Sequence, residues 1–311
     1  MQVIRGLHNL RAEHRGCVAT IGNFDGVHLG HQAVFRNLRE RAAAFGLPTT
    51  VVTFEPQPQE FFAPDAAPAR LTRMREKLQA LKDAGIDRVV LLEFGRKLAS
   101  MSARQFVQQL LVDGLDVKFL YVGDDFRFGR GRVGDINLLR QVGEARGFEV
   151  ANMNTFMDGE ARVSSTRIRE ALAQGNLDLA ERNLGRPYQI CGRVAHGDAR
   201  GRTIGFPTAN IDLHRKVSPV HGVFAVMVHG LAEGSLPGVA NIGNRPTVTG
   251  DSRYLLEVHL FDFSRVIYGE HVGVEFRKWL RDERRFESFD ALRQQIERDA
   301  AQARAFFDID K

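Results

Sequence analysis

Residues 18–31 read VATIGNFDGVHLGH, and the fold class of the first half of the chain follows from this stretch. Its first four residues are typical of a short buried strand, and residues 32–45 after it carry apolar side chains at helical spacing. The segment 22–31 between them is rich in glycine and histidine. A strand that passes into a helix through such a segment predicts a βα unit with a ligand-binding loop at the carboxyl end of the strand.

The same alternation of strand and helix continues to about residue 184. Apolar runs at 49–54, 88–92 and 118–122 indicate further buried strands. The segments between and after them have helical spacing, at 72–84, 103–111, 136–145, 166–173 and 177–184. This succession predicts an α/β, Rossmann-like domain with a parallel, doubly wound sheet over residues 1–184.

The pattern changes after residue 184. Short alternating runs, such as 222–229 and 254–261, are separated by Gly, Pro and Asn, which is typical of an antiparallel sheet or small barrel. A last helix is expected at 289–307, with Ser288 as its N-cap. The sequence therefore predicts a second domain, residues 185–311, made of a small antiparallel β-barrel and a terminal helix.

Composition excludes several classes of protein. With 311 residues, 43% of them hydrophobic and 26% charged, the chain suits two soluble globular domains. No apolar run approaches the ~20 residues that span a bilayer, and the first residues do not resemble a signal peptide. We expect a cytoplasmic protein that is a monomer or a weak homo-oligomer and has no membrane partner. The two cysteines, Cys17 and Cys191, are too few for a disulfide framework or a zinc cluster.

The charge pattern points to small anionic substrates. The net charge is +5, and the excess is spread over both halves of the chain. A nucleic-acid-binding module, the alternative that a basic chain raises, usually shows a concentrated basic stripe. We therefore expect anionic small molecules such as nucleotides, and no nucleic acid, as partners.

Residues 22–31 have the composition of a phosphate-binding loop. Gly22 allows a close approach of the backbone to a ligand, and Gly26 and Gly30 permit tight turns. The following helix directs free N–H groups and its positive dipole end at an anion. His28 and His31, three residues apart, face one side of the first helical turn, where imidazoles can stabilise charge on a triphosphate. A glycine-rich turn with two partly buried histidines is the plainer alternative. The presence of Asp25 and three glycines with both histidines favours the phosphate site.

Two other stretches of the first half fit such a site. Residues 163–169, VSSTRIR, predict a helix start with small hydroxyls and cationic forks that bind phosphate; taken alone they are an ordinary capped helix. Residues 122–129, VGDDFRFG, close a predicted strand. There Asp124 and Asp125 could bind a hydroxyl or ribose of the substrate and Arg127 could attract phosphate, although a simple charged loop explains the residues equally well.

The second half carries its own glycine-rich segment, residues 192–210, GRVAHGDARGRTIGFPTAN. Gly197, Gly201 and Arg202 could bring the backbone and a cation close to phosphates. Thr208 and Asn210 are neutral oxygen ligands two residues apart, so in an extended segment they face one side and could hold Mg²⁺ together with nucleotide phosphates. A hairpin with a β-bulge is the alternative.

Each half resembles a known family. GNFDGVHLGH together with SSTRIR resembles the HxGH superfamily of nucleotidyltransferases. GRTIGFPTANI, with NIGNRPT at 241–247, resembles the riboflavin kinases, in which an acid lies in a strand ending in an E-x-H pattern, here LEVH at 256–259. The two halves together resemble the bifunctional bacterial enzymes that phosphorylate riboflavin and adenylylate FMN, over essentially the full chain.

The resemblance implies residue roles and substrates. Glu257 would be the general base of the kinase, with Gly197, Gly201, Arg202 and Thr208 around its ATP, and Mg²⁺ on Thr208 and Asn210. His28 and His31 would act in adenylyl transfer. The remaining expected ligands of the ATP used in adenylyl transfer, or of its phosphates, are Gly22, Phe24, Asp25, Gly30, Ser164, Thr166, Arg167 and Arg169. Asp124, Asp125 and Arg127 would be candidates for contacts with the flavin or ribose. ATP is the co-substrate, and riboflavin, FMN and FAD are substrates or products.

Two alternatives use the same motifs. One is a nucleotidyltransferase for another small phosphate fused to an unrelated barrel, which the GFPTAN and NIGNRPT stretches disfavour. The other is an enzyme with one inactive domain, which the intact motifs in both halves disfavour.

Overall fold

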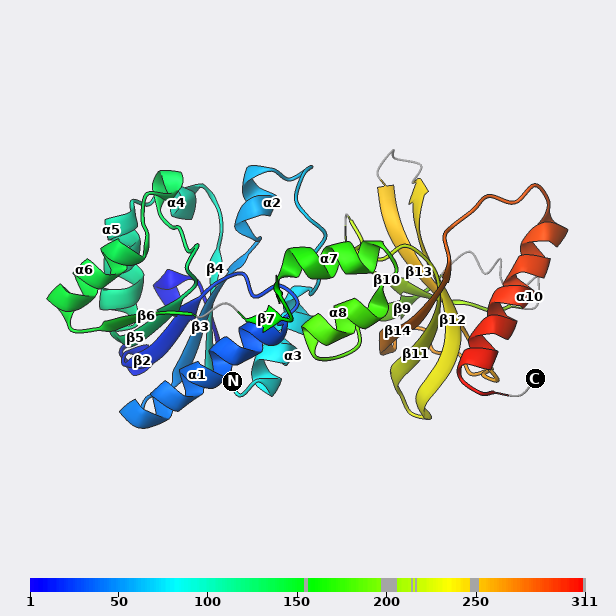
Figure 1. Ribbon diagram of the computed structural model, residues 1–311, viewed down its shortest axis with the longest axis horizontal. Coiled ribbons are helices and arrows are strands. Elements are labelled where there is room, and N and C mark those ends of the chain that lie inside the picture. The colour runs from blue at the N-terminus through cyan, green and yellow to red at the C-terminus, as the bar shows by residue number, and fades with distance from the viewer. Residues whose placement is uncertain (154–155, 197–205, 214, 216, 247–251, 310–311) are drawn as a thin grey trace. The chain divides into compact units, whose positions relative to one another are not determined.

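The computed structural model describes residues 1–153, 156–196, 206–213, 215, 217–246 and 252–309. By its internal packing the chain forms two compact units (Figure 1), one made of Met1–Pro68 and Thr72–Val163 and the other of Ala69–Leu71 and Ser164–Lys311. This division by packing is distinct from the division by function expected at residue 184, which stays a prediction.

The first unit is built on a parallel sheet, as the sequence predicted, and this sheet has six strands. Its strands are β1 (Gln2–Arg5), β2 (Cys17–Ile21), β3 (Thr49–Glu55), β4 (Arg88–Glu93), β5 (Val117–Val122) and β6 (Glu149–Asn152). They lie in the order β1-β4-β3-β2-β5-β6. From β2 the chain runs to β3 and β4 on one side and then to β5 on the other, so the order reverses at β2. Ligands of open α/β sheets bind at this point, beyond the carboxyl ends of the strands.

Helices cover both faces of this sheet (Figure 1). They are α1 (Leu29–Phe45), α2 (Pro58–Phe62), α3 (Met74–Asp83), α4 (Arg96–Ala99), α5 (Ala103–Phe106) with its continuation η3 (Val107–Gly114), and α6 (Ile136–Arg146). Short helices η1 (Leu7–Asn9), η2 (Ala12–His14) and η4 (Arg130–Arg132) and the hairpin of β7 (Met157–Asp158) and β8 (Ala161–Arg162) complete the unit. Adjacent residues of β2 enter different cores, because Val18 packs with Leu38 of α1 and Ala19 with Leu110 of η3. Burial on both faces explains the continuous apolar runs of the strands.

The second unit is a closed antiparallel barrel, also as predicted. Its strands are β9 (Gln189–Ala195), β10 (Ala209–Asp212), β11 (Gly222–Leu231), β12 (Gly234–Pro246), β13 (Ser252–Leu260) and β14 (His271–Arg281), in the order β10-β13-β12-β11-β14-β9. Helices α7 (Ser165–Ala173) and α8 (Leu177–Leu184) precede it and α10 (Phe289–Phe306) follows it.

The terminal helix lies against the outside of the barrel (Figure 1). Ser288 caps α10, as expected, because its hydroxyl accepts a hydrogen bond from the N–H of Ala291 at 3.1 Å. Phe224 and Phe276 fill the barrel interior, whereas Val223 and Val239 face outward and pack with Ala300 and Ala303 of α10. Among the described residues, none of the helices has both the length and the apolar character that crossing a membrane requires.

Candidate active sites

The loop after β2 is held in an unusual backbone conformation. Phe24 and Val27 have positive φ, 47° and 44°, as does Gly26 at 84°, a region that side chains with a Cβ seldom adopt. A buried contact with Thr72 stabilises the loop: the Thr72 N–H donates to Oδ1 of Asp25 at 3.0 Å, and the Gly26 N–H donates to Oγ1 of Thr72 at 2.9 Å. Asp25 is 3% exposed. In this structure its carboxylate orders the loop, while its predicted contact with ATP stays a prediction.

His28 and His31 lie together at the start of α1. Their rings stack with centroids 3.6 Å apart, so they do share one side of the first turn. His28 is the N-cap of α1, and its Nδ1 accepts from the His31 N–H at 3.4 Å. Because an N–H only donates, Nδ1 carries no proton and the neutral ring is protonated at Nε2, the tautomer that can donate to a phosphate. A Cβ at Gly30 would lie 3.1 Å from Cε1 of His28, so glycine there leaves space for this ring.

A lysine that the sequence analysis missed adds positive charge to this site. Lys77 of α3 is completely buried. Burial holds the pKa of His31 well below its ordinary value, and the electrostatic effects of nearby His28 and Lys77 lower it further, so the ring is neutral at pH 7. Lys77 and Leu81 are the buried residues of α3. A lysine at helical spacing from a buried leucine was therefore the sequence signal that could have identified it.

The SSTRIR segment forms the first turn of α7. The Ser164 hydroxyl caps this helix by accepting from the Arg167 N–H at 3.2 Å, as the capped-helix interpretation requires. The Arg169 Nε donates to the carbonyl of Ala69 at 2.6 Å. Thr166 is exposed and Arg167 partly buried. The phosphate contacts expected of these four residues stay a prediction.

The acidic pair lies beyond β5, the neighbour of β2 in the sheet. Asp124 and Asp125 are exposed, and Arg162 lies 3.7 Å from Asp125. Arg127 forms an ion pair with Asp135 at 3.0 Å. Asp135 also caps α6, and the backbone N–H of Leu138 with Arg127 holds its pKa below the usual range. The structure thus gives Arg127 a local partner in the loop; contacts of these three residues with flavin or ribose stay a prediction.

In the second unit, one row of residues crosses the outer face of the barrel. Asn210 of β10 lies opposite Glu257 of β13, Glu257 lies opposite Asn241 of β12, and Asn241 lies opposite Val223 of β11. Directly opposed residues of antiparallel strands share a face. Register therefore brings the predicted base Glu257 beside the predicted metal ligand Asn210, which is 8% exposed. Gly197, Gly201 and Arg202 lie outside the described residues.

A cavity of about 370 Å³ lies over the Glu257, Asn241 and Val223 part of this row, between the barrel and α10, and Asn210 is not among its lining residues. Thr208, Asn241, Glu257 and His259 line it from the barrel, and Leu292 and Ile296 line it from α10. Its remaining lining residues are mainly aromatic or charged, namely Phe206, Val223, Val239, Ala240, Arg281, Glu283, Arg284, Phe286, Phe289 and Asp299. A cleft of this size, with aromatic and aliphatic walls beside convergent polar and charged groups, suits an organic ligand with both an apolar and a polar part.

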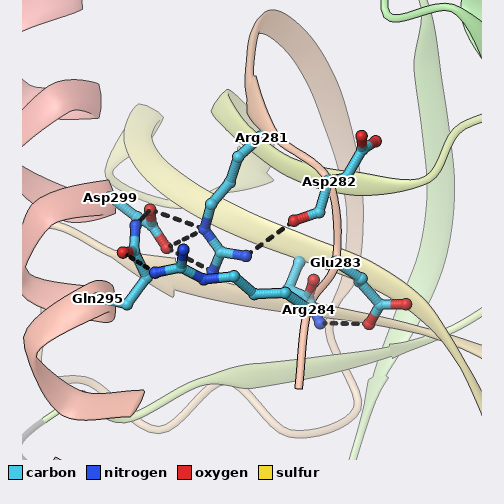
Figure 2. Close-up of polar contacts among 7 residues, drawn as sticks. Arg281, Asp282, Glu283, Arg284, Gln295 and Asp299 are labelled. Carbon is cyan, nitrogen blue, oxygen red and sulfur yellow. Dashed lines mark hydrogen bonds and ion pairs between the residues drawn. The ribbon is translucent and has the colours of Figure 1, made fainter. Parts of the chain in front are cut away.

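The rim of the cavity is held by a buried ion pair that the sequence analysis did not identify (Figure 2). Asp299 of α10, whose side chain is 4% exposed, accepts from Nε and Nη2 of Arg281 at 3.0 and 2.7 Å. Gln295 donates to the same carboxylate at 2.7 Å and accepts from Arg284. Glu283 accepts from the Asn241 side chain at 3.3 Å. These contacts connect the end of β14 to α10 and to the Glu257 row.

Comparison with known proteins gives matches over both units. The FAD synthetase family model matches residues 10–167, and the riboflavin kinase family model matches residues 184–307. The bifunctional riboflavin kinase/FMN adenylyltransferase of Escherichia coli K12 is 56% identical over 312 residues, covering 100% of this chain and 99% of that protein. The Pseudomonas fluorescens protein of the same name is 54% identical over 305 residues, covering 98% and 97%.

A solved structure has the same fold. It is described as a macrolide-efflux protein from Streptococcus pneumoniae, with a TM-score of 0.81, 32% identity and coverage of 96% of this chain and 97% of that one. The efflux activity in its description belongs to that protein and is not transferred, since both family models that match here describe flavin enzymes. The chain belongs to the family of bifunctional riboflavin kinases/FMN adenylyltransferases.

Proposed function

We propose that this chain synthesises FAD in two steps at two separate sites. Riboflavin is phosphorylated by ATP at the cavity between the barrel and α10, and the FMN product is adenylylated by a second ATP at the loop after β2. The observation that carries the proposal is a cavity of about 370 Å³ lined by Glu257 and Asn241, with Asn210 opposite Glu257 in register, in a chain that matches both family models. We further propose that the two functions divide at residue 184.

In the kinase step, Glu257 acts as general base. Its carboxylate takes the proton of the ribityl 5′-hydroxyl while that oxygen forms a bond to the γ-phosphorus of ATP, and the bond from this phosphorus to the β,γ-bridging oxygen breaks to release ADP. The apolar walls Leu292, Ile296 and Phe286 exclude water from the isoalloxazine ring and from the acceptor hydroxyl, which limits hydrolysis of ATP.

The oxygen donors beside Glu257 fit a Mg²⁺ ion. A threonine hydroxyl and an asparagine carbonyl are hard neutral ligands, and Mg²⁺ binds few protein ligands together with phosphates and water. Thr208 lines the cavity with Glu257, and Asn210 lies opposite Glu257 in register. Thr208 and Asn210 would hold the ion, which when bound neutralises charge on the ATP phosphates.

In the adenylyl transfer, the protein needs no nucleophile of its own. An oxygen of the FMN phosphate attacks the α-phosphorus of ATP, and the bond to the bridging oxygen breaks to release pyrophosphate. The Nε2–H of His28, the neutral ring of His31 stacked against it and the buried charge of Lys77 provide donors and positive potential where the triphosphate gains charge. The N-terminal N–H groups of α1 add to this field.

Substrate supply suggests the compartment. ATP and reduced thiols are both found in the cytoplasm, where we place the enzyme. Neither Cys17 nor Cys191 forms a disulfide within the described residues, and burial raises the pKa of Cys17 to about 11, so this thiol is unreactive. We expect a monomer or a weak homo-oligomer.

The proposal is tested by incubating the pure chain with riboflavin, ATP and MgCl₂ and separating the flavins over time. We expect FMN to appear first and FAD to follow. A preparation that folds but converts neither riboflavin to FMN nor added FMN to FAD would show that the proposal is wrong.

A further inference from the structure

His259 lies on β13 at the place where the backbone pairing between β10 and β13 ends. The first pair of that ladder is Ala209 opposite Val258, so Pro207 and Thr208 come before it. Nδ1 of His259 lies 2.9 Å from the carbonyl oxygen of Pro207. A side-chain hydrogen bond therefore continues the contact between the two segments beyond the last backbone pair.

The hydrogen-bond partner of His259 determines which nitrogen of its imidazole carries the proton. A carbonyl only accepts, so Nδ1 of His259 carries the proton and donates. The ring stands edge to face with Phe206, with centroids 5.2 Å apart, and with Phe261, with centroids 5.9 Å apart. Burial lowers the pKa of His259, and this effect is larger than the opposite effect of the Pro207 carbonyl, which raises the pKa. Of the nearby charges, Arg304 lowers this pKa and Asp262 raises it. The imidazole is thus a packed, neutral donor at pH 7.

We propose that His259 is a positioning residue of the kinase site, which fixes the Pro207 carbonyl and thereby holds Thr208 over the reacting groups. The φ of Pro207 is already restricted by its ring, so fixing its carbonyl oxygen also fixes the peptide plane that carries the N and Cα atoms of Thr208. Thr208, Glu257 and His259 line the same cavity. The inference rests on the proposed function, in which Thr208 binds the cation and phosphates of ATP.

Three substitutions separate this role from others. His259→Phe keeps a ring between Phe206 and Phe261 but removes the donor. His259→Asn places an amide nitrogen near the position of Nδ1, whereas His259→Gln places it near Nε2. The matched control is His229→Phe on β11, because His229 also has a hydrogen-bonded Nδ1, to Ser235 at 2.8 Å, and does not line the cavity.

The experiment measures riboflavin kinase and FMN adenylyltransferase kinetics on each full-length variant. Because small displacements of a bound phosphate cost up to about 100-fold in rate, we expect His259→Phe to lower the kinase kcat roughly 10- to 100-fold and to raise the KM for ATP. The KM for riboflavin and the adenylylation of added FMN should change less than about twofold. His259→Asn should recover most of the kinase rate. His259→Gln should behave like His259→Phe, and the control His229→Phe should behave like the wild type.

Several results would overturn the inference. One is wild-type kcat and KM for ATP in His259→Phe, and another is rescue by Gln but not Asn, which would mean that Nε2 acts on the substrate. Equal loss of kinase rate and of barrel stability in all three variants, without a change in the KM for ATP, would indicate packing alone. Thr208→Ala separates the two hypotheses: if it keeps full kinase activity, the proposed role of Thr208 is wrong, and if it loses activity while His259→Phe does not, only the inference fails.

Discussion

Removing one partner of the ion pair between Arg281 and Asp299 should strongly destabilise the barrel unit. Replacing Asp299 with Ala removes the carboxylate that receives Nε and Nη2 of Arg281 and the amide of Gln295. The substitution leaves the Arg281 guanidinium, which lies beside α10, without this counter-charge (Figure 2). Loss of one partner of a buried pair usually destabilises a protein by about 3–5 kcal/mol, because the remaining charge is still desolvated.

Exposure sets the expected value within that range. The Asp299 side chain is 4% exposed but that of Arg281 is 20% exposed, so water can partly solvate the remaining charge. We therefore expect Asp299→Ala to cost about 3 kcal/mol. Glu297→Ala is the matched control on the same helix, since the Arg293–Glu297 pair is 60% and 50% exposed and such a pair contributes only about 0.3–0.5 kcal/mol.

The single tryptophan makes the measurement specific to the barrel. Trp279 lies on β14, two residues before Arg281, so its fluorescence during urea unfolding reports the second unit in the full chain. With a slope of about 2 kcal/mol/M, the midpoint should fall by about 1.5 M for Asp299→Ala. The double variant Arg281→Met/Asp299→Leu should regain most of this loss, because apolar replacement of a buried pair is often neutral. A shift no larger than that of Glu297→Ala would refute the reasoning.

Other predictions concern the two sites. Replacing both His28 and His31 with Ala should slow FAD formation at least about 100-fold, with FMN accumulating from riboflavin; unchanged FAD production in a flavin chromatogram would contradict the phosphate role. Glu257→Gln should lower the riboflavin kinase rate about 10²- to 10⁴-fold, while added FMN is still converted to FAD at the wild-type rate. The pKa of His31 is lowered in the folded state, so its contribution to stability is present above about pH 6.5 and decreases as the pH falls. Binding of a triphosphate should raise this pKa, so calorimetry near pH 6 in two buffers should show proton uptake that His31→Asn abolishes.

The main elements of the fold could be predicted from the sequence because their apolar periodicity is strong. The four strands expected in the first unit are all present, whereas β1 and β6 were not predicted. These two strands lie at the edges of the sheet, where each pairs with one neighbour. Val3 of β1 and Glu149 of β6 are exposed, so neither strand has the continuous apolar run of a central strand.

The start of α1 shows a different limit. The helix was expected from residue 32 but begins at Leu29, with His28 as its N-cap. Histidine is not among the usual capping residues, so His28 did not mark the helix boundary, although the spacing of His28 and His31 had already placed both on the first helical turn. The helix expected at 103–111 likewise continues as η3 to Gly114.

The motifs identified candidate ligands, but the residues that hold them in place come from elsewhere in the chain. Thr72 orders the loop of Asp25, Lys77 lies near His31, and Asp299 fixes the rim of the cavity above Glu257. Such residues share one property: each is polar and buried. A buried polar group destabilises the fold unless it has a partner, so its presence implies a specific contact.

This property gives a sequence signal that periodicity alone overlooks. Gln295 and Asp299 occupy the buried face of α10 with Ala300 and Ala303, and Lys77 shares the buried face of α3 with Leu81. A charged residue on the apolar stripe of an amphipathic helix should therefore be examined as part of a site before it is accepted as an imperfection of the pattern. In this chain both charged residues found in that way lie beside a phosphate-transfer site that the motifs predict.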